Sequence, residues 1–546
     1  MKIKDFSVSC RQVTQSTVDR LVVDFVCESL QPFTIVELPT FKNLICTMQP
    51  SCTVMSRPTV KLRIEEAAAK IKKNIIAEMA KVNYIGTTTD CWTARQRSYI
   101  GVTAHWIDEP TLERRSASIA FRRLKGSHTF DLLAGTLVDI HSEYGISEKI
   151  VRTTTDSGSN FIKAFRVYGE QSQQELIDAE ADSAEAVTLD DENDAEGFEV
   201  QDTSSIFNAN SGLEYHLPKH QRCACHLLNL VATVDASKAE DSSEVFKKLS
   251  RSTFAKCQAL YNKTSRSAIS AEIVQEECKL QFIQPNHTRW NSVYNAAERV
   301  MRILKEQGEA SLRNVCAAFK IKMLNPAEVS YLSEYCIVMK PVSMALNILQ
   351  SETNTQMGWL LPTIYLLDSK LKKMEASVKV CLSLIHALQR GLQKRFGEFM
   401  EDPELISAAI LLPKFKTSWT DKAHIIGAGM DYILHRLDAM KDTQENESQH
   451  VSDEDDFFSS IKTVSSTRAS ELDGYLACAS EEMELLHSFP LVKKLSLKLN
   501  TPLPASAACE RLFSCAGQLF TPRRARLDST NFENQLIVKL NNKFKM

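Results

Sequence analysis

Hydrophobic residues recur with a period of two between residues 83 and 155. In SYIGVTAHWID, every second residue from Ile100 to Trp106 is apolar, which is the pattern of a β-strand with one buried face. The stretch Ser116–Phe121 can pair beside this strand, residues 128–142 favour a helix, and EKIVRTTTD predicts a further short strand that ends at Asp156. This order of strands and a helix predicts an α/β sheet.

Most of the remaining chain has the pattern of α-helices. The first 80 residues predict a helical region, in which one helix runs from Thr59 to about Met79. Residues 221–440 show an almost continuous helical pattern that is interrupted at prolines. Near the C-terminus, one helix is expected to begin close to Ser506, and a last helix covers residues 531–541.

Charge divides the chain further. Residues 170–202 contain 13 acidic residues and neither Lys nor Arg, so this segment cannot bury enough apolar surface to fold and predicts a disordered loop. A shorter acidic stretch containing SDEDD predicts a flexible linker. The predicted regions are, in chain order, N-terminal helices at 1–80, the first part of an α/β core at 81–169, the acidic loop at 170–215, a helical domain at 216–440, the linker at 441–468 and a C-terminal region at 469–546.

The composition describes a soluble globular protein with more than one domain. The chain has 546 residues, of which 43% are hydrophobic and 24% are charged, and this length exceeds what one compact core accommodates. It contains no run of about 18 apolar residues, so no membrane span is predicted, and its start lacks the apolar core of a signal peptide.

The 15 cysteines do not have zinc-finger spacing, so we expect reduced thiols and no structural zinc. These features favour the cytosol or the nucleus, whereas the net charge of −3 decides nothing about nucleic acid.

Two similar stretches, TTTDCWTA at 87–94 and TTTDSGSN at 153–160, carry an aspartate at the end of a predicted strand. If the two strands are neighbours, Asp90 and Asp156 come together, and close carboxylates repel unless a proton or a cation lies between them. Mg²⁺ prefers oxygen ligands and also binds phosphate. A pair of such ions can activate water and stabilise the leaving oxygen in phosphodiester cleavage. The alternative is structural, since aspartates at strand ends also cap the next turn or helix.

An ordered set of short motifs resembles the hAT superfamily of cut-and-paste transposases, and more narrowly its BED-finger-associated branch. The motifs are TTDCWTA (88–94), TTDSGSNF (154–161), RCACHLLNL (222–230), TRWNS (288–292), PASAACERLFSCAG (504–517) and RRARL (523–527). The resemblance covers most of the chain. It implies an α/β RNase H-like catalytic core interrupted by a large all-α insertion, with an N-terminal helical region and a C-terminal helical dimerisation segment.

The acidic triad of the family corresponds to Asp90, Asp156 and Glu510, the last of which lies in CERLFS. By resemblance, these residues hold Mg²⁺ or Mn²⁺ and catalyse DNA cleavage and strand transfer. The long separation between Asp156 and Glu510 then fits a core that closes only after an inserted helical domain. In this interpretation, the first helix of the C-terminal region completes the active centre.

The resemblance also points to residues that contact DNA. Cys223 and His226 match the CxxH motif of the family and either face DNA or brace the core, where cysteine packs as a small hydrophobe. Arg289 and Trp290 match an RW element whose aromatic ring stacks on an extruded base, and the alternative is a Trp buried in a helical core.

The C-terminal region carries a basic turn and an apolar helix. The arginines of the turn can contact phosphates, remain solvated or pair with acids at a dimer seam. These residues are Arg523, Arg524 and Arg526. One face of the last helix presents Phe532, Leu536 and Leu540, and this face is either core or an interface between chains. Because the family names this region for dimerisation, we expect a homodimer or a larger assembly.

No BED-type finger precedes residue 17, so the sequence does not assign the module through which such transposases recognise their DNA. Two functions are therefore predicted. In the first, the chain is an enzyme that cleaves DNA and transfers the strand. In the second, it is a domesticated, catalytically inactive nuclear protein that acts in transcription or chromatin. Both predict DNA and a second copy of the chain as partners, no membrane association and a nuclear location.

Overall fold

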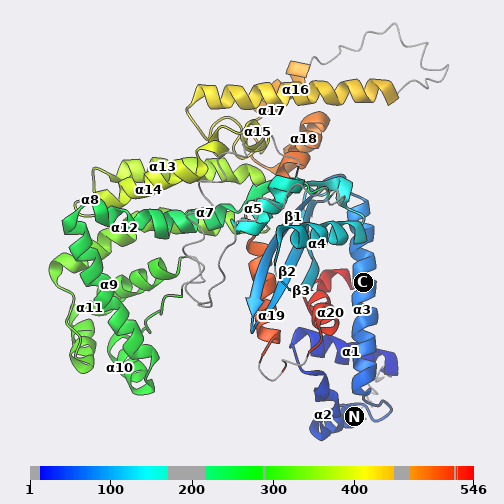
Figure 1. Cartoon of the computed structure of the whole chain (residues 1–546), viewed down its shortest axis with the longest axis horizontal. Helices are drawn as coiled ribbons and strands as arrows, with labels where there is room; N and C mark the ends of the chain where they lie inside the picture. Colours follow the sequence, from blue (N-terminus) through cyan, green and yellow to red (C-terminus); the bar gives the residue numbers. More distant parts are fainter. Residues whose placement is uncertain are drawn as a thin grey trace, which may run out of the picture.

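The protein is a mixed α/β structure in which one sheet stands beside a long helical arm (Figure 1). The computed structural model describes residues 13–126, 128–169, 215–286, 291–353, 355–447, 468–521, 524 and 527–545. The loop predicted at 170–215, apart from Tyr215, and residues 448–467 of the predicted linker lie outside this part of the chain.

Five strands form the sheet, in the spatial order β3-β2-β1-β4-β5. They are β1 (Ile85–Ala94), β2 (Arg97–Ile107), β3 (Arg114–Leu124), β4 (Ile150–Thr155) and β5 (Lys219–Arg222). β1, β2 and β3 pair antiparallel, whereas β4 lies parallel to β1 and β5 lies parallel to β4. The strands and the helix predicted between residues 98 and 156 are confirmed, but β5 was not predicted because KHQR is short and polar.

The helices fall into three groups along the chain. Those of the N-terminal region and the sheet are α1 (Gln15–Glu28), α2 (Pro39–Met48), α3 (Arg57–Ala80), α4 (Phe130–Glu143) and α5 (Ser159–Tyr168). The middle of the chain forms α7 (Ala224–Leu230), α8 (Ala239–Ser242), α9 (Glu244–Ser265), α10 (Ala268–Cys278), α11 (Ser292–Phe319), α12 (Pro326–Leu349), α13 (Leu360–Met374), α14 (Leu382–Phe396), α15 (Pro403–Ile410), α16 (Ala423–Glu447), α17 (Arg468–Ala477) and α18 (Pro490–Asn500). The chain ends with α19 (Ala507–Leu519) and α20 (Ser529–Leu540). None of the described helices is both long and apolar enough to cross a membrane.

Side chains alternate between the two faces of the sheet. On one face, Ile100, Val102 and Trp106 join a core shared with α1, α3, α4 and α5. On the opposite face, Tyr99 and Phe121 pack against side chains of α19 and α20. The C-terminal helices therefore cover a sheet that is formed mostly by the first third of the chain.

The threonine runs of β1 and β4 are buried and hydrogen-bonded between strands. Thr87 and Thr153 share a hydrogen bond of 2.7 Å, and Thr88 shares one of 2.6 Å with Thr103. A buried hydroxyl is costly unless it has a hydrogen-bond partner. The paired threonines meet this requirement and bind the strands to one another through side chains as well as backbone.

Two glycines allow the C-terminal segment to lie directly on the sheet. A Cβ atom at Gly86 would lie 2.6 Å from the Cα atom of Pro502, and one at Gly101 would lie 2.6 Å from the ring of Phe513. The hydroxyl of Thr154 donates a hydrogen bond of 2.7 Å to the backbone carbonyl of Leu503. The segment that leads into α19 is thus held against β1, β2 and β4.

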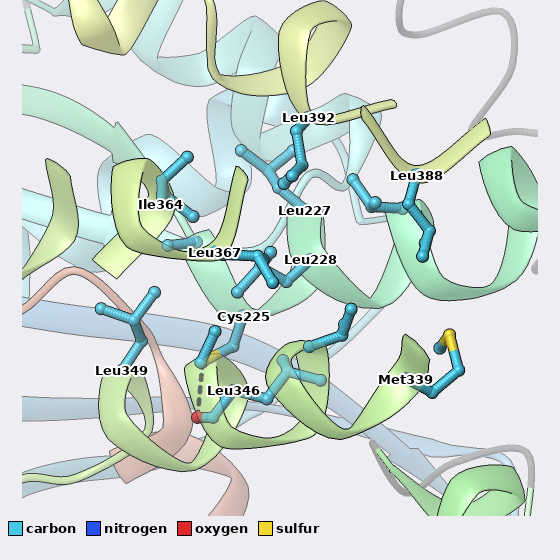
Figure 2. Close-up of a cluster of buried hydrophobic side chains, with 14 of the residues drawn as sticks. Cys225, Leu227, Leu228, Met339, Leu346, Leu349, Ile364, Leu367, Leu388 and Leu392 are labelled. Atoms are coloured by element: carbon cyan, nitrogen blue, oxygen red, sulfur yellow. Dashed lines mark hydrogen bonds between the residues drawn. The ribbon is translucent and has the colours of Figure 1, made fainter. Parts of the chain in front are cut away.

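The helical arm has its own large apolar core, which includes α7. Figure 2 shows Cys225, Leu227 and Leu228 of α7 among apolar side chains of α12, α13 and α14. The Cys225 thiol donates a weak hydrogen bond of 3.8 Å to the backbone carbonyl of Leu346 in α12. Since α7 directly follows β5, this packing connects the arm to the edge of the sheet.

A buried ion pair makes a second connection between the sheet and the helices. Arg152 of β4 is 5% exposed and lies 2.5 Å from Glu404 of α15. Burial acts to raise the pKa of Glu404, but the charges of Arg152 and Lys219 outweigh it and lower that pKa to about 2. Breaking such a pair leaves a buried charge without compensation, so this contact fixes where α15 meets the sheet.

The predicted dimerisation face of α20 is buried within the chain itself. Phe532 and Leu536 are each 1% exposed and pack with Tyr99 and Phe121 of the sheet, and Leu540 is partly buried against the same cluster. The prediction that Phe532 and Leu536 form a surface between chains is therefore wrong. Their apolar spacing reflects the core of one chain.

We predict that Gly86→Ala loosens the C-terminal segment from the sheet. The new methyl group would approach the backbone of Pro502, which cannot move aside as a flexible side chain could. We expect the free energy of unfolding to fall by about 1–3 kcal/mol, as for other overpacked sites. Urea denaturation measures this loss, and limited proteolysis should cleave the variant faster between α18 and α19.

Gly427→Ala in α16 is the matched control, because a Cβ atom there meets nothing within 4 Å. This substitution should leave the stability unchanged or raise it by about 0.4–1 kcal/mol. Equal stability of Gly86→Ala and the wild type would contradict the close docking of the segment.

Candidate acidic active site

The parallel register of β1 and β4 brings two aspartates together. Thr88 is paired with Thr154; Asp90 lies two residues further along β1, and Asp156 directly follows the last residue of β4. Because side chains alternate along β1, the Asp90 carboxylate points to the face that carries the C-terminal segment. The expectation that neighbouring strands bring these residues together agrees with the pairing of β1 with β4 and with the effect of the Asp156 charge, which raises the pKa of Asp90.

Backbone amides orient both carboxylates. The N–H of Cys91 donates a hydrogen bond of 2.7 Å to Oδ1 of Asp90, and the N–H of Gly158 donates one of 3.0 Å to Oδ1 of Asp156. Asp156 lies in the loop between β4 and α5, as the small residues after it predict. These contacts also agree in part with the structural alternative, since Asp156 supports the turn that precedes α5.

Glu510 reaches the same site from α19. The preceding residue, Cys509, is completely buried, and its thiol lies 3.3 Å from the backbone carbonyl of Thr88 and 3.5 Å from that of Gly101. Glu510 itself is exposed and lies close enough to Asp156 to interact with its charge. A residue from the far end of the sequence is thus seated beside two residues of the sheet.

Burial and neighbouring charges raise the pKa of two of the three carboxyl groups, those of Asp90 and Glu510. Burial raises the pKa of Asp90 well above its usual value, and the charges of Asp156 and Glu510 raise it further. Loss of solvation and the charge of Asp156 raise the pKa of Glu510 to about 7. In the folded protein, negative charge at this site is therefore unfavourable without a compensating positive charge.

The donor set suits a hard divalent cation. Carboxylate oxygens are the ligands that Mg²⁺ and Mn²⁺ prefer, and Mg²⁺ is commonly held by one or two carboxylates together with water and phosphate oxygens. Asp90 and Asp156 fit this description, with Glu510 beside them. Among the described residues, however, no group of three or more His, Cys, Asp or Glu side chains is already arranged around a single metal position. The site is thus compatible with Mg²⁺ through two aspartates rather than through a closed three-residue cage.

Cys223 lies beneath the chain that leads into α19 and contacts its backbone. Its side chain is completely buried, and its sulfur accepts hydrogen bonds of 3.4 Å from the backbone N–H groups of His226 and Ser506. Burial raises the pKa of the Cys223 thiol to about 11, so the thiol is neutral. Because no atom of this side chain is accessible, direct contact between Cys223 and DNA is incompatible with the structure. It caps the start of α7 and holds the residue that precedes α19, whereas His226 is half-buried.

The other predicted DNA contacts are only partly described. Arg289, Trp290, Arg523 and Arg526 lie outside the described residues, so their roles stay predictions. Arg524 is half-buried, and burial lowers the pKa of its guanidinium. Its Nη1 atom is buried without a hydrogen-bond partner in the part of the chain that the structure describes. Arg524 therefore packs against the protein in this conformation rather than pointing into solvent.

Sequence reasoning missed the residues that seat Glu510. Cys509 stands within a recognised motif, but its contacts to the sheet depend on tertiary packing that no local pattern reveals. One signal was available in the strand itself. In β1, residues Gly86, Thr88 and Asp90 share a face by period two, so the smallest side chains on that face mark where another segment approaches closely.

Part of the sheet is similar to an RNase-like domain. The family model described as the ZBED1 RNase-like domain matches residues 88–179, a range that includes most of β1 and the Asp156 loop. The chain is 26% identical over 275 residues to the "Putative AC transposase" of Zea mays, a match covering 48% of this chain and 28% of that protein.

Two further relatives differ in how much of the chain they match. The "Putative transcriptional regulator tpeD" of Talaromyces stipitatus is 30% identical over 166 residues, which cover 29% of this chain and 19% of the relative. The human "Zinc finger BED domain-containing protein 4" is 21% identical over 562 residues, which cover 96% of this chain and 43% of the relative. The chain thus corresponds to less than half the length of each of these relatives.

We predict that Asp90→Asn stabilises the metal-free protein. Because the pKa of Asp90 is raised in the folded state, the fold loses stability as the pH rises above about 4, the pKa of this carboxyl in the unfolded chain. The uncharged side chain of Asn removes this loss. One pKa unit corresponds to about 1.4 kcal/mol, so we expect a gain of that order at pH 8 and a smaller gain at pH 5. Unfolding curves in EDTA at both pH values measure this difference.

Asp139→Asn is the control, since Asp139 is exposed on α4, which packs on the face of the sheet opposite α19. Added Mn²⁺ should stabilise the wild type and the control more than Asp90→Asn. A gain in stability that does not depend on pH would contradict the electrostatic origin.

Proposed function

This chain is one of the hAT-related, transposase-derived proteins, and from that premise we propose that it is a nuclear DNA-binding protein whose sheet is an RNase H-like catalytic core. The helical arm is then the insertion that interrupts this core, and α19 completes it. Asp90, Asp156 and Glu510 form a DDE-type triad that supports metal-dependent cleavage of DNA and transfer of the strand.

The observation that carries the proposal is the proximity of three carboxyl groups from β1, the loop after β4 and α19, close enough for their charges to interact. Here burial and like charges raise the pKa of both Asp90 and Glu510. Such perturbation is typical of functional sites, and bound cations would remove its cost.

The protein residues position the reacting groups. Divalent cations bound by Asp90 and Asp156 would supply the activation of water and the stabilisation of the leaving 3′ oxygen. The amides of Cys91 and Gly158 hold the two carboxylates in a fixed orientation before any ligand arrives. Without bound metal, loss of solvation and the charge of Asp156 raise the pKa of Glu510 to about 7; cations bound beside it would lower this pKa and favour the carboxylate form.

A second candidate function is a catalytically inactive nuclear protein that acts in transcription or chromatin. It is favoured by the resemblance to a fungal protein whose name describes a transcriptional regulator. Self-association belongs to both candidates. Since Phe532 and Leu536 are buried within one chain, a second copy would have to use another surface of the C-terminal region.

The proposal is tested by Mg²⁺-dependent nicking of supercoiled DNA by the purified chain. We expect Asp156→Asn to reduce nicking by on the order of 10²–10³-fold, a typical loss when one group that stabilises a transition state is removed. Asp139→Asn, a conservative change on the opposite face of the sheet, should retain wild-type activity.

Equal activity of Asp156→Asn and the wild type would dispose of the catalytic role. Binding of DNA without metal-dependent nicking by any form of the protein would instead support the inactive nuclear protein. EDTA should abolish nicking by the wild type but leave its binding to DNA intact.

A further inference from the structure

An unusual turn closes the β1–β2 hairpin. It consists of two residues, Arg95 and Gln96, which both have positive φ angles, of 50° and 59°. Two-residue hairpin turns with this geometry strongly favour Asn and Gly, because other side chains are strained there. A long basic side chain at such a position suggests a function for the turn, since strain of this kind persists where the surroundings enforce it.

The turn gathers positive charge over one aromatic ring. The guanidinium carbons of Arg95 and Arg97 both lie 5.7 Å from the centre of the Phe520 ring, which is 5% exposed. The ring attracts both guanidinium groups and so holds the two side chains in place. Because the ring carries no net charge, it does not neutralise them. Within the described part of the chain, neither arginine forms an ion pair with a carboxylate.

The end of β3 adds two further basic residues beside the turn. Arg123 is the register partner of Tyr99, and Lys125 follows directly after the strand. Both side chains are exposed, and no ion pair joins either to a described carboxylate. Arg95, Arg97, Arg123 and Lys125 together form what we call the basic ridge.

The basic ridge lies on the same face of the sheet as the acidic site. Asp90 pairs with Gly101, Trp92 with Tyr99, and Ala94 with Arg97, and these three pairs share a face because side chains alternate along a strand. From Asp90 to Ala94 is four residues, or about 13 Å at roughly 3.3 Å per residue. This span corresponds to about four nucleotides along one strand of a DNA duplex.

We propose that the basic ridge binds the phosphodiester backbone of the DNA duplex whose phosphate is presented to Asp90 and Asp156. This inference rests on the proposed function. Arginine and lysine contacts to phosphates fix the position of DNA without reading its sequence. The ridge therefore sets how far the duplex extends from the carboxylates and in which direction, and it is indifferent to base sequence.

The test measures binding of a fluorescein-labelled 30-base-pair duplex by anisotropy, in EDTA so that no cleavage occurs, across a series of salt concentrations. We expect Arg95→Ala/Arg97→Ala to weaken binding about tenfold at 0.1 M salt. Its plot of log affinity against log salt should also be less steep by about two, since each phosphate contact contributes about 0.9 to that slope. Arg302→Ala/Arg313→Ala on α11, in the helical arm, is the charge-matched control and should bind as the wild type does.

A second variant separates charge from folding. Arg95→Asn/Gln96→Gly installs the residues that the turn geometry favours, so the melting temperature should rise while binding to the duplex weakens and the slope falls by about one. A turn with a purely structural role would give the rise in melting temperature with unchanged binding, and that result would overturn the inference. A ridge-dependent preference for duplex RNA over DNA would overturn it as well.

Failure of the proposed function looks different. If the wild-type chain does not bind the DNA duplex at any salt concentration, both proposals fail. If the wild type binds but the two ridge variants keep its affinity and salt slope, only the role of the ridge is refuted.

Discussion

The close approach of the C-terminal segment to the bare face of the sheet is the constraint on which the rest of the structure depends. Gly86 and Gly101 have no side chain, so Pro502 and Phe513 can lie directly on the strands. Cys509 then meets the carbonyl groups of Thr88 and Gly101. These contacts decide where Glu510 stands. Without them the sheet would keep its two aspartates, but the third acid would have no defined position, and the helical arm would lose one of its attachments.

A polar interior accompanies this docking. The threonines of β1 and β4 are buried, and their hydroxyls pair across strands or with the C-terminal segment. Each hydroxyl contributes little net stability when paired and costs about 1–3 kcal/mol when its partner is lost. A shift of the register between β1 and β4 would orphan several of these groups at once. The same register pairs Thr88 with Thr154, two residues before Asp90 and Asp156, so the threonines help to set the geometry of the acidic site.

The sequence predicted this site well where the information was local. Alternation and turn residues indicated the strands, and two aspartates in like positions predicted their meeting at the ends of neighbouring strands. It failed where one face of an element could serve two purposes. The apolar spacing of Phe532 and Leu536 is the same for a dimer interface and for an intramolecular core. Likewise, the CxxH motif reads the same whether Cys223 faces DNA or caps α7. Only tertiary packing distinguishes these cases. The Arg95–Gln96 turn was hidden for the opposite reason, because its residues are not those that its geometry favours.

The face that carries the acidic site holds two groups of charges, one negative and one positive. Burial and like charges raise the pKa of Asp90 and of Glu510, and the basic ridge has no carboxylate partner among the described residues. The two regions cannot neutralise each other, because unit charges about 13 Å apart attract by only about 0.3 kcal/mol in water. In the proposed function, a cation would bind at the acids and a phosphate at the arginines. A DNA strand with bound Mg²⁺ carries both, and a single ligand of that kind would relieve both costs at the same time. On this view, the charge separation prepares the face for DNA and metal together, and either one alone would leave part of it uncompensated.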